Sequence, residues 1–178
     1  EYNVGTTSGD WYSGPKDAKG VPASTMRDGT PKGYAFLHVD GNQYKFDYKV
    51  ANSPKEKQID LYHTKKVKEG KRNRAFLYAN FFMGHESNKV EYRVNNGEWK
   101  EMNWDPTVDY NYMETIMKID NAEITNIGNR PSAPEISKHI WSVRLPNKLK
   151  AGTYPIEVRA TDLYGNTFTE KSSFEVIK

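Results

Sequence analysis

Short runs in which apolar and charged residues alternate constrain the fold of this chain more than any other feature. The alternation is clearest in residues 89–94 (KVEYRV), and it returns in residues 141–145 and 154–160. Successive side chains of a β-strand point to opposite faces, so this period of two is typical of strands with one buried face. No helical pattern is long enough to build strand–helix–strand units. The sequence therefore predicts an all-β protein, an antiparallel β-sandwich of the immunoglobulin or fibronectin type III kind.

Residues 34–50 (YAFLHVDGNQYKFDYKV) predict the first hairpin of this sandwich. A two-residue turn at Gly41, with either Asp40 or Asn42, places the apolar residues of both strands on one face. A three-residue loop would turn one apolar set toward water, so the pattern specifies the register.

Residues 89–102 predict a second hairpin. Asn96 and Gly97 are the residue pair that a type I′ turn prefers, and pairing across this turn places Val94 opposite Trp99. We therefore expect Trp99, like Trp141, to lie on an inner face and to join the core.

Two more strands are expected at residues 58–63 and 75–82. The second of them (AFLYANFF in residues 75–82) is apolar on both faces, which favours a central position in a sheet. Residues 103–138 follow no regular period and predict a long irregular insertion, in which residues 108–119 have a short helical pattern.

Residues 11–34 are rich in Gly and Pro, yet they carry large side chains that flexible linkers rarely contain. This combination indicates an ordered loop that bears a function or an interface. We therefore divide the chain into an ordered lead-in that packs on the body, residues 1–33, and a β-sandwich, residues 34–178.

Composition excludes several classes of protein. The 178 residues contain no Cys, which rules out disulfides, thiolate metal sites and a cysteine nucleophile. The 26 basic and 23 acidic residues give a net charge of +3, a mixed surface that argues against nucleic-acid binding. Residues 65–74 (KKVKEGKRNR) are a local basic exception, for which a solvated loop and an anion or lipopolysaccharide contact both stay open. No transmembrane segment or signal peptide is recognisable.

No constellation of catalytic residues stands out. The four histidines, His38, His63, His85 and His139, are isolated and never have metal-ligand spacing. The chain contains no nucleophile elbow, phosphate-binding loop or dinucleotide fingerprint. We therefore expect no catalytic residue and no metal site in this chain.

Aromatic and arginine side chains in loops are the candidates for binding. Residues 27–29 (RDG) are either a turn in which Asp28 caps backbone amides, or part of a contact that Arg27 makes beside aromatic residues. The predicted interface consists of Trp11, Tyr12, Met26, Arg27 and Asp28. In an alternative interpretation, Trp11 and Trp104 are stacking platforms for a carbohydrate.

Residues 8–50 resemble the start of the C-terminal domain of bacterial calcineurin-like phosphoesterases. The matching positions are Trp11-Tyr12-Ser13-Gly14, Asp17, Gly20, Pro22, Met26, Asp28-Gly29, Pro31 and Gly33-Tyr34. The resemblance continues through residues 90–102 and 151–168, and it is weakest in residues 103–138.

The resemblance implies an accessory domain that lacks its enzyme. The two-metal site of such phosphoesterases needs Asp-x-His, Gly-Asp-x-x-Asp, Gly-Asn-His-Asp/Glu and Gly-His-x-His, and none of these strings occurs here. It thus implies a noncatalytic domain without a cofactor, whose partner is the catalytic phosphoesterase domain of the same polypeptide, where the two metals would be bound. By the same resemblance, we expect a periplasmic, extracellular or cell-surface location.

Three functions follow from these expectations and stay open at this point. The first is a noncatalytic β-sandwich that docks on or supports the phosphoesterase domain. The second is a carbohydrate-binding module, with a glycan as its partner. The third is a plain spacer or adhesin-like domain.

Overall fold

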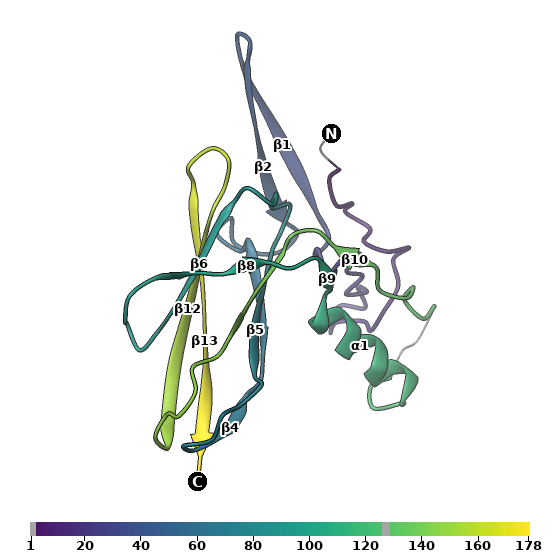
Figure 1. Cartoon of the computed structure of the whole chain (residues 1–178). Helices are drawn as coiled ribbons and strands as arrows, with labels where there is room; N and C mark the ends of the chain where they lie inside the picture. Colours follow the sequence, from purple (N-terminus) through teal and green to yellow (C-terminus); the bar gives the residue numbers. More distant parts are fainter. Residues whose placement is uncertain (1–2, 126–128) are drawn as a thin grey trace. The chain divides into compact units, whose positions relative to one another are not determined.

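The computed structural model describes residues 3–125 and 129–178, and its regular structure is predominantly β, as the alternation predicts (Figure 1). The chain divides into two compact units, each built from two segments. Unit 1 comprises residues 1–58 and 106–138, and unit 2 comprises residues 59–105 and 139–178.

Unit 2 contains a four-stranded antiparallel sheet in the order β3-β5-β11-β8. These strands are β3 (Ile59–His63), β5 (Phe76–Phe81), β11 (Ile140–Arg144) and β8 (Asn103–Trp104). Strand β5 has a neighbour on each side, so the central position predicted from its two apolar faces is confirmed.

The second sheet of unit 2 has five strands in the order β4-β13-β12-β6-β7. They are β4 (Lys66–Lys68), β13 (Thr167–Ile177), β12 (Gly152–Thr161), β6 (Lys89–Val94) and β7 (Lys100–Glu101). All pairs in this sheet are antiparallel except β4 and β13, which run parallel.

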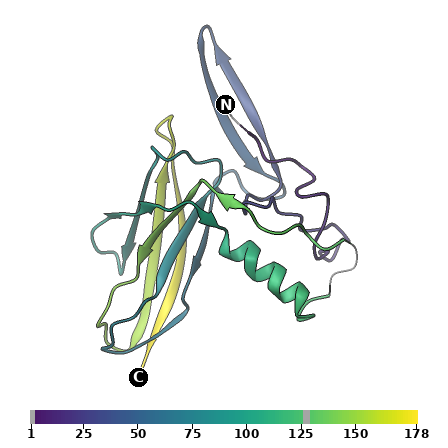
Figure 2. The same ribbon diagram turned by 45° about the vertical axis from the view of Figure 1, so that its right-hand side comes forward.

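The core of unit 2 is formed by the facing sides of these two sheets (Figure 2). Leu77, Ala79 and Trp141 from one sheet are fully buried together with Ile156 and Phe174 from the other. Two sheets that share one apolar layer are a β-sandwich, so the predicted fold class is confirmed.

The turn of the second hairpin differs from the prediction by one residue. Asn95 and Asn96 both have positive φ (52° and 55°), and the N–H of Gly97 donates to the carbonyl of Val94 at 3.0 Å. The turn is therefore centred on Asn95 and Asn96, which is possible because asparagine tolerates the left-handed conformation better than most residues with a Cβ atom.

Because the turn is shifted, Trp99 does not reach the core. Strand β6 pairs with β7 in the register Glu91 opposite Glu101, which does not place Trp99 opposite Val94. The Trp99 ring is half-buried and contacts two guanidinium groups, with the Cζ atoms of Arg93 and Arg159 at 4.6 and 4.3 Å from its centroid. The core position predicted for Trp141 is confirmed.

The first hairpin belongs to unit 1 and forms a sheet of its own. Strand β1 (Gly33–Asp40) pairs with β2 (Gln43–Val50), and Asp40 is opposite Gln43, which confirms the predicted two-residue turn. Leu37 lies opposite Phe46, so the apolar residues share one face as expected.

Unit 1 also contains helix α1 (Tyr110–Asp120) and a small sheet of β9 (Thr107–Val108) and β10 (Ile136–Ser137). Asp109 begins the helix, because its Oδ1 accepts a hydrogen bond from the N–H of Tyr112 at 2.7 Å. The stretch predicted as irregular therefore has more regular structure than expected, including the predicted short helix. Residues 126–128 lie outside the described residues.

The compact units do not follow the boundary that we placed after residue 33. The hairpin of residues 33–50 is grouped with residues 3–32 in unit 1, and neither of its strands joins a sandwich sheet. Our division into residues 1–33 and residues 34–178 assumes that the first segment packs on the second. This assumption stays a prediction.

Candidate functional site

Residues 3–32 form a loop whose backbone is held by local hydrogen bonds. Asp17 Oδ1 accepts from the backbone N–H groups of Lys19 and Val21, both at 2.9 Å. These bonds, the one from Val21 above all, stabilise the carboxylate and hold the pKa of Asp17 below its usual range. The loop therefore presents its large side chains from a defined backbone.

Gly9 and Ser24 are a point of close backbone approach within this loop. Gly9 has φ of +64°, and a Cβ atom at this position would lie 1.5 Å from the carbonyl oxygen of Ser24. The hydroxyl of Ser24 donates to the carbonyl of Ser8 at 2.7 Å and accepts from the N–H of Ser13 at 3.1 Å. Only glycine fits here, and the contact fastens the loop on both sides of Trp11 and Tyr12.

Trp11 and Tyr12 are two consecutive residues with positive φ, 55° and 52°. Such a conformation is unfavourable for large side chains, and it is retained here between the buried residues Asp10 and Ser13. The Trp11 side chain is 84% exposed and that of Tyr12 is 55% exposed. The loop therefore holds two aromatic rings in solvent even though the backbone beneath them is strained.

The predicted interface residues Met26, Arg27 and Asp28 form a second turn. The N–H of Met26 donates to the carbonyl of Thr30 at 2.8 Å, and Asp28 Oδ1 accepts from the N–H of Thr30 at 2.9 Å. Asp28 thus caps the backbone amide of Thr30, in keeping with the turn interpretation.

Arg27 reaches a distant part of the sequence within unit 1. Its Nε donates to the carbonyl of Ala133 at 3.0 Å, and its guanidinium lies 3.5 Å from a carboxylate oxygen of Glu135. Arg27 is therefore already engaged within this unit, while its half-buried side chain keeps part of its surface accessible.

The turn of Trp11 and the turn of Arg27 are both tied to residues 132–135. Asp10 Oδ2 accepts from the N–H of Ser132 at 3.0 Å, next to the residues that Arg27 holds. The hydroxyl of Tyr112 on α1 donates to the carbonyl of Ser132 at 2.8 Å, and burial raises the pKa of this tyrosine to about 12. One segment thus contacts both turns that contain the five predicted interface residues, through Asp10 in one turn and Arg27 in the other. The role of the five residues as an interface stays a prediction.

Trp104, the second candidate for carbohydrate stacking, belongs to unit 2. It lies on the edge strand β8, opposite Trp141, and its side chain is 40% exposed. Trp11 and Trp104 therefore belong to different units, and carbohydrate binding by either stays a prediction.

The sequence did not predict that apolar side chains of hairpin β1–β2 are exposed. Val39 and Tyr44 are opposite neighbours on its apolar face, and they are 67% and 66% exposed. Phe36 on the other face is exposed as well. This hairpin alternates apolar and polar residues in the same way as the strands of the core do. The sequence therefore contains no signal that its apolar face is exposed to solvent.

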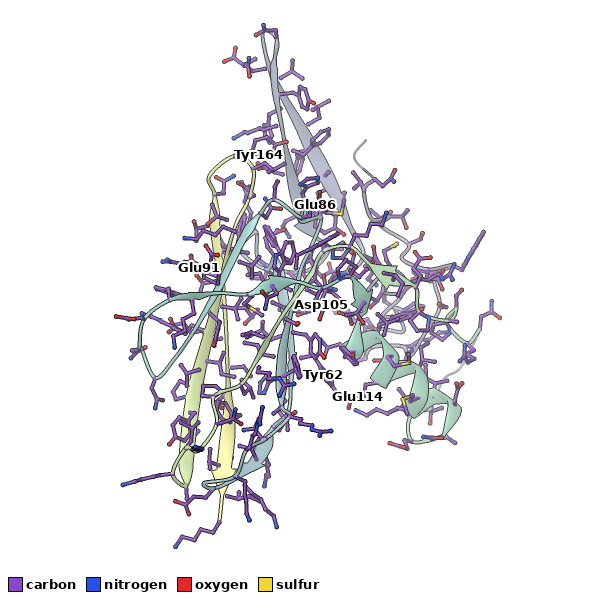
Figure 3. The ribbon with its side chains drawn as sticks, viewed as in Figure 1. Tyr62, Glu86, Glu91, Asp105, Glu114 and Tyr164 are labelled. Atoms are coloured by element: carbon purple, nitrogen blue, oxygen red, sulfur yellow. The ribbon has the colours of Figure 1, made fainter. Side chains whose placement is uncertain are left out.

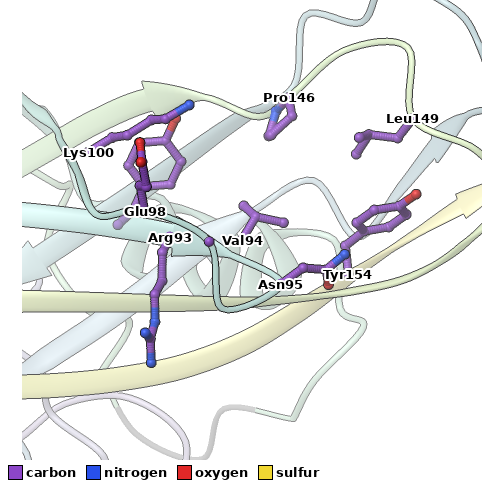
Figure 4. Close-up of a pocket in the computed structure, with 10 residues that line it drawn as sticks. Arg93, Val94, Asn95, Glu98, Lys100, Pro146, Leu149 and Tyr154 are labelled. Carbon is purple, nitrogen blue, oxygen red and sulfur yellow. The ribbon is translucent and has the colours of Figure 1, made fainter.

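A pocket of unit 2 lies between the β6–β7 hairpin and the loop that follows β11 (Figure 4). Its cavity volume is about 260 Å³, and Val94, Pro146, Leu149 and Tyr154 supply much of its wall. Arg93 also lines it, but its guanidinium points away and pairs with Glu157. None of the predicted site residues lines this pocket.

Each of the four histidines contacts a different partner side chain. His38 Nε2 lies 3.0 Å from Asp47, His63 Nε2 lies 2.7 Å from the hydroxyl of Ser172, and His85 Nδ1 lies 2.8 Å from that of Ser87. Nδ1 of His139 lies 2.7 Å from the side-chain oxygen of Asn80. Among residues 3–125 and 129–178, no three His, Asp or Glu side chains are grouped so that they could hold a metal ion.

These features define a β-rich protein in which a sandwich accompanies a loop-and-hairpin unit with exposed aromatic side chains. The family model described as the C terminal of calcineurin-like phosphoesterase matches residues 1–168, and the chain belongs to this family. The comparison with curated proteins gave no match. The helix of the described residues is too short to cross a membrane.

Proposed function

We propose that this chain is a noncatalytic accessory domain that docks on the calcineurin-like phosphoesterase domain of the same polypeptide. The observation that carries the proposal is the 84% exposure of Trp11 from a strained, hydrogen-bonded turn. Exposing a tryptophan in this way is unfavourable for an isolated domain, whereas buried aromatic anchors dominate the energetics of protein interfaces. Trp11 and Tyr12 are therefore the proposed anchors.

The distribution of exposed apolar side chains supports docking through unit 1. This unit contains about half of the residues but ten of the fourteen large apolar side chains that are exposed among the described residues. The ten are Val4, Trp11, Tyr12, Tyr34, Phe36, Leu37, Val39, Tyr44, Met117 and Ile136. Exposed apolar side chains at this density favour a surface that a partner covers.

In this proposal, the phosphoesterase domain of the full-length protein carries out catalysis, and the present chain does not. Hydrolysis of a phosphoester by two metal ions needs ligands that converge on both ions, and the family's ligand strings are missing from this sequence. The docked domain acts by stabilising or orienting the phosphoesterase domain. Its activity on phosphoesters as an isolated chain is therefore expected to be zero.

The docking proposal is tested in the full-length protein with the double variant Trp11→Ala/Tyr12→Ala. The matched control is Leu163→Ala/Tyr164→Ala, which removes two exposed apolar side chains from the β12–β13 connection in unit 2 (Figure 3). Calorimetry should show a lower unfolding temperature of the phosphoesterase domain in the first variant only. Hydrogen exchange should show faster exchange at the surface of that domain.

Two results would overturn docking through this turn. In the first, both double variants unfold at the same temperatures as the unmodified protein. In the second, the isolated chain binds a polysaccharide in affinity electrophoresis and Trp11→Ala or Trp104→Ala abolishes the binding, which would establish carbohydrate recognition instead.

We further propose that the whole protein is exported to the periplasm, the cell surface or the medium. The support is the family resemblance. Cell fractionation of the native host, with an antibody against this chain, would detect it outside the cytoplasm, and recovery in the cytoplasmic fraction alone would refute the proposal.

A further inference from the structure

We propose that one end of the sandwich in unit 2 binds a surface of anionic, phosphate-bearing lipids. This end, here called the basic end, consists of residues 65–74, 146–151 and 175–178. It includes the basic run of the sequence and two segments that are remote from it along the chain. The proposal is independent of docking through unit 1.

The three segments are joined by backbone hydrogen bonds. The N–H of Glu69 donates to the carbonyl of Ile177 at 2.7 Å, and the N–H of Gly70 donates to that of Leu149 at 3.1 Å. Strand β4 also pairs with the last residues of β13. Both views of unit 2 show β4, the last residues of β13 and the connection between β11 and β12 at the same end (Figures 1 and 2).

Folding concentrates charge at this end. The three segments contain nine basic and two acidic residues, a net charge of +7. The rest of the chain has 17 basic and 21 acidic residues and a net charge of −4, although the whole chain has only +3. The small net charge of the whole chain is thus the sum of a strongly basic end and a moderately acidic remainder.

The basic side chains of this end are exposed and mostly unpaired. Val67 is buried in the core, so the alternation of β4 turns Lys66 and Lys68 outward. Glu175 pairs with Lys66 at 3.3 Å, and Glu69 accepts from the N–H of Ala151 at 3.1 Å. Lys65 Nζ lies 3.0 Å from His63 Nε2. The remaining basic side chains, which form no ion pair among the described residues, are Lys68, Lys71, Arg72, Arg74, Lys148, Lys150 and Lys178.

The composition of the basic end, rich in lysine and without aromatic residues, favours binding to a lipid surface over binding to a nucleic acid. Seven of the nine basic residues are lysines, and the three segments contain no aromatic residue. Single-stranded nucleic acids are bound by aromatic stacking, and base edges are read by the planar arginine fork. Clustered lysines instead suit a diffuse layer of phosphate groups, and the partly exposed Ile177 adds an apolar contact to it.

The test is sedimentation of the 178-residue chain with vesicles of phosphatidylcholine that contain about one-third phosphatidylglycerol, or none. We expect at least about tenfold tighter binding to the anionic vesicles, which weakens as salt is added. The triple variant Lys68→Glu/Lys148→Glu/Lys150→Glu should lose this preference. The control Lys19→Glu/Lys45→Glu/Lys100→Glu changes the net charge equally at exposed positions elsewhere and should keep it.

Each other outcome overturns the proposal. Equal binding by the two triple variants would show that net charge alone acts, and salt-independent binding by the unmodified chain would exclude an electrostatic surface. Displacement from vesicles by inorganic phosphate at low concentration would indicate a site for a free phosphate. Tighter binding to single-stranded DNA than to the anionic vesicles would indicate a nucleic-acid site. The salt dependence of the unmodified chain keeps the proposal refutable even if a variant fails to fold.

Discussion

Arg159 Nε donates to Glu91 Oε2 at 2.8 Å across the paired strands β6 and β12, and Glu91 also pairs with Lys89 at 3.0 Å. Glu91 lies on the outer face of the five-stranded sheet (Figure 3), where its side chain is buried beneath its partners. The hydrogen bond from Arg159, followed by that from Lys89, holds the pKa of Glu91 below its usual range near 4.5. An ion pair thus stabilises the sheet opposite the core.

We expect the variant Glu91→Gln to lower the free energy of unfolding by about 1 to 3 kcal/mol, because Arg159 and Lys89 lose a charged acceptor. Urea denaturation of the chain measures the effect. Glu175→Gln is the matched control, since it breaks the exposed pair with Lys66 and should change stability by less than about 1 kcal/mol. Equal effects of the two variants would contradict this account of Glu91.

The same contact predicts a dependence on pH. The pKa of Glu91 is lower in the folded state than in the unfolded state, so its stabilisation is complete above about pH 4.5 and is lost as the pH falls through the folded value. The difference in unfolding free energy between the unmodified chain and Glu91→Gln should therefore shrink on acidification. A constant difference between about pH 7 and 3 would refute this linkage.

His63 predicts a second dependence, at higher pH. Burial lowers the pKa of His63 below 6.5, and the neighbouring charge of Lys65 acts in the same direction. The unfolded chain then takes up this proton first, so the contribution of neutral His63 is complete above about pH 6.5 and declines below it. The variant His63→Gln should show a smaller loss of stability between about pH 7 and 5. Parallel curves for both proteins would show that His63 is not responsible.

The approach of Gly9 to Ser24 predicts an unequal response of two glycines. Gly9→Ala should destabilise the chain by about 3 kcal/mol or more, because it adds a collision to an unfavourable φ. Gly20 has a similar φ of +76° with open space around it, so Gly20→Ala should cost only about 1 kcal/mol. Thermal unfolding of both variants checks the difference, and similar values would contradict the close approach.

The strain at Trp11 predicts that a smaller residue is tolerated there. Asparagine adopts positive φ more readily than tryptophan, and little buried surface is lost because Trp11 is exposed. Trp11→Asn should therefore leave the unfolding free energy of the isolated chain unchanged or raise it by up to about 1 kcal/mol. A loss of more than about 1 kcal/mol in urea denaturation would mean that Trp11 stabilises this domain itself.

Local sequence determined where the longer strands lie and the register of the first hairpin, but not the register of the second. Alternation with a period of two located β6 and β12, and the two apolar faces of residues 75–82 identified β5 as central, because both signals depend only on how a strand orients its own side chains. The turn at Gly41 was predictable for the same reason. The turn at Asn95 and Asn96 was not, because three consecutive residues there tolerate positive φ and the pairing of β6 with β7 selects among them.

Only the tertiary structure decided which apolar faces are covered. The apolar faces of β1–β2 and of β6 show the same alternation in sequence, yet Val39 is exposed and Val90 is buried, because burial depends on what other segments pack there. The strain at Trp11 and the charge of the basic end also arise from contacts between remote segments. The sequence by itself determined an all-β chain of this family, and the fold decided where its aromatic and basic side chains face solvent.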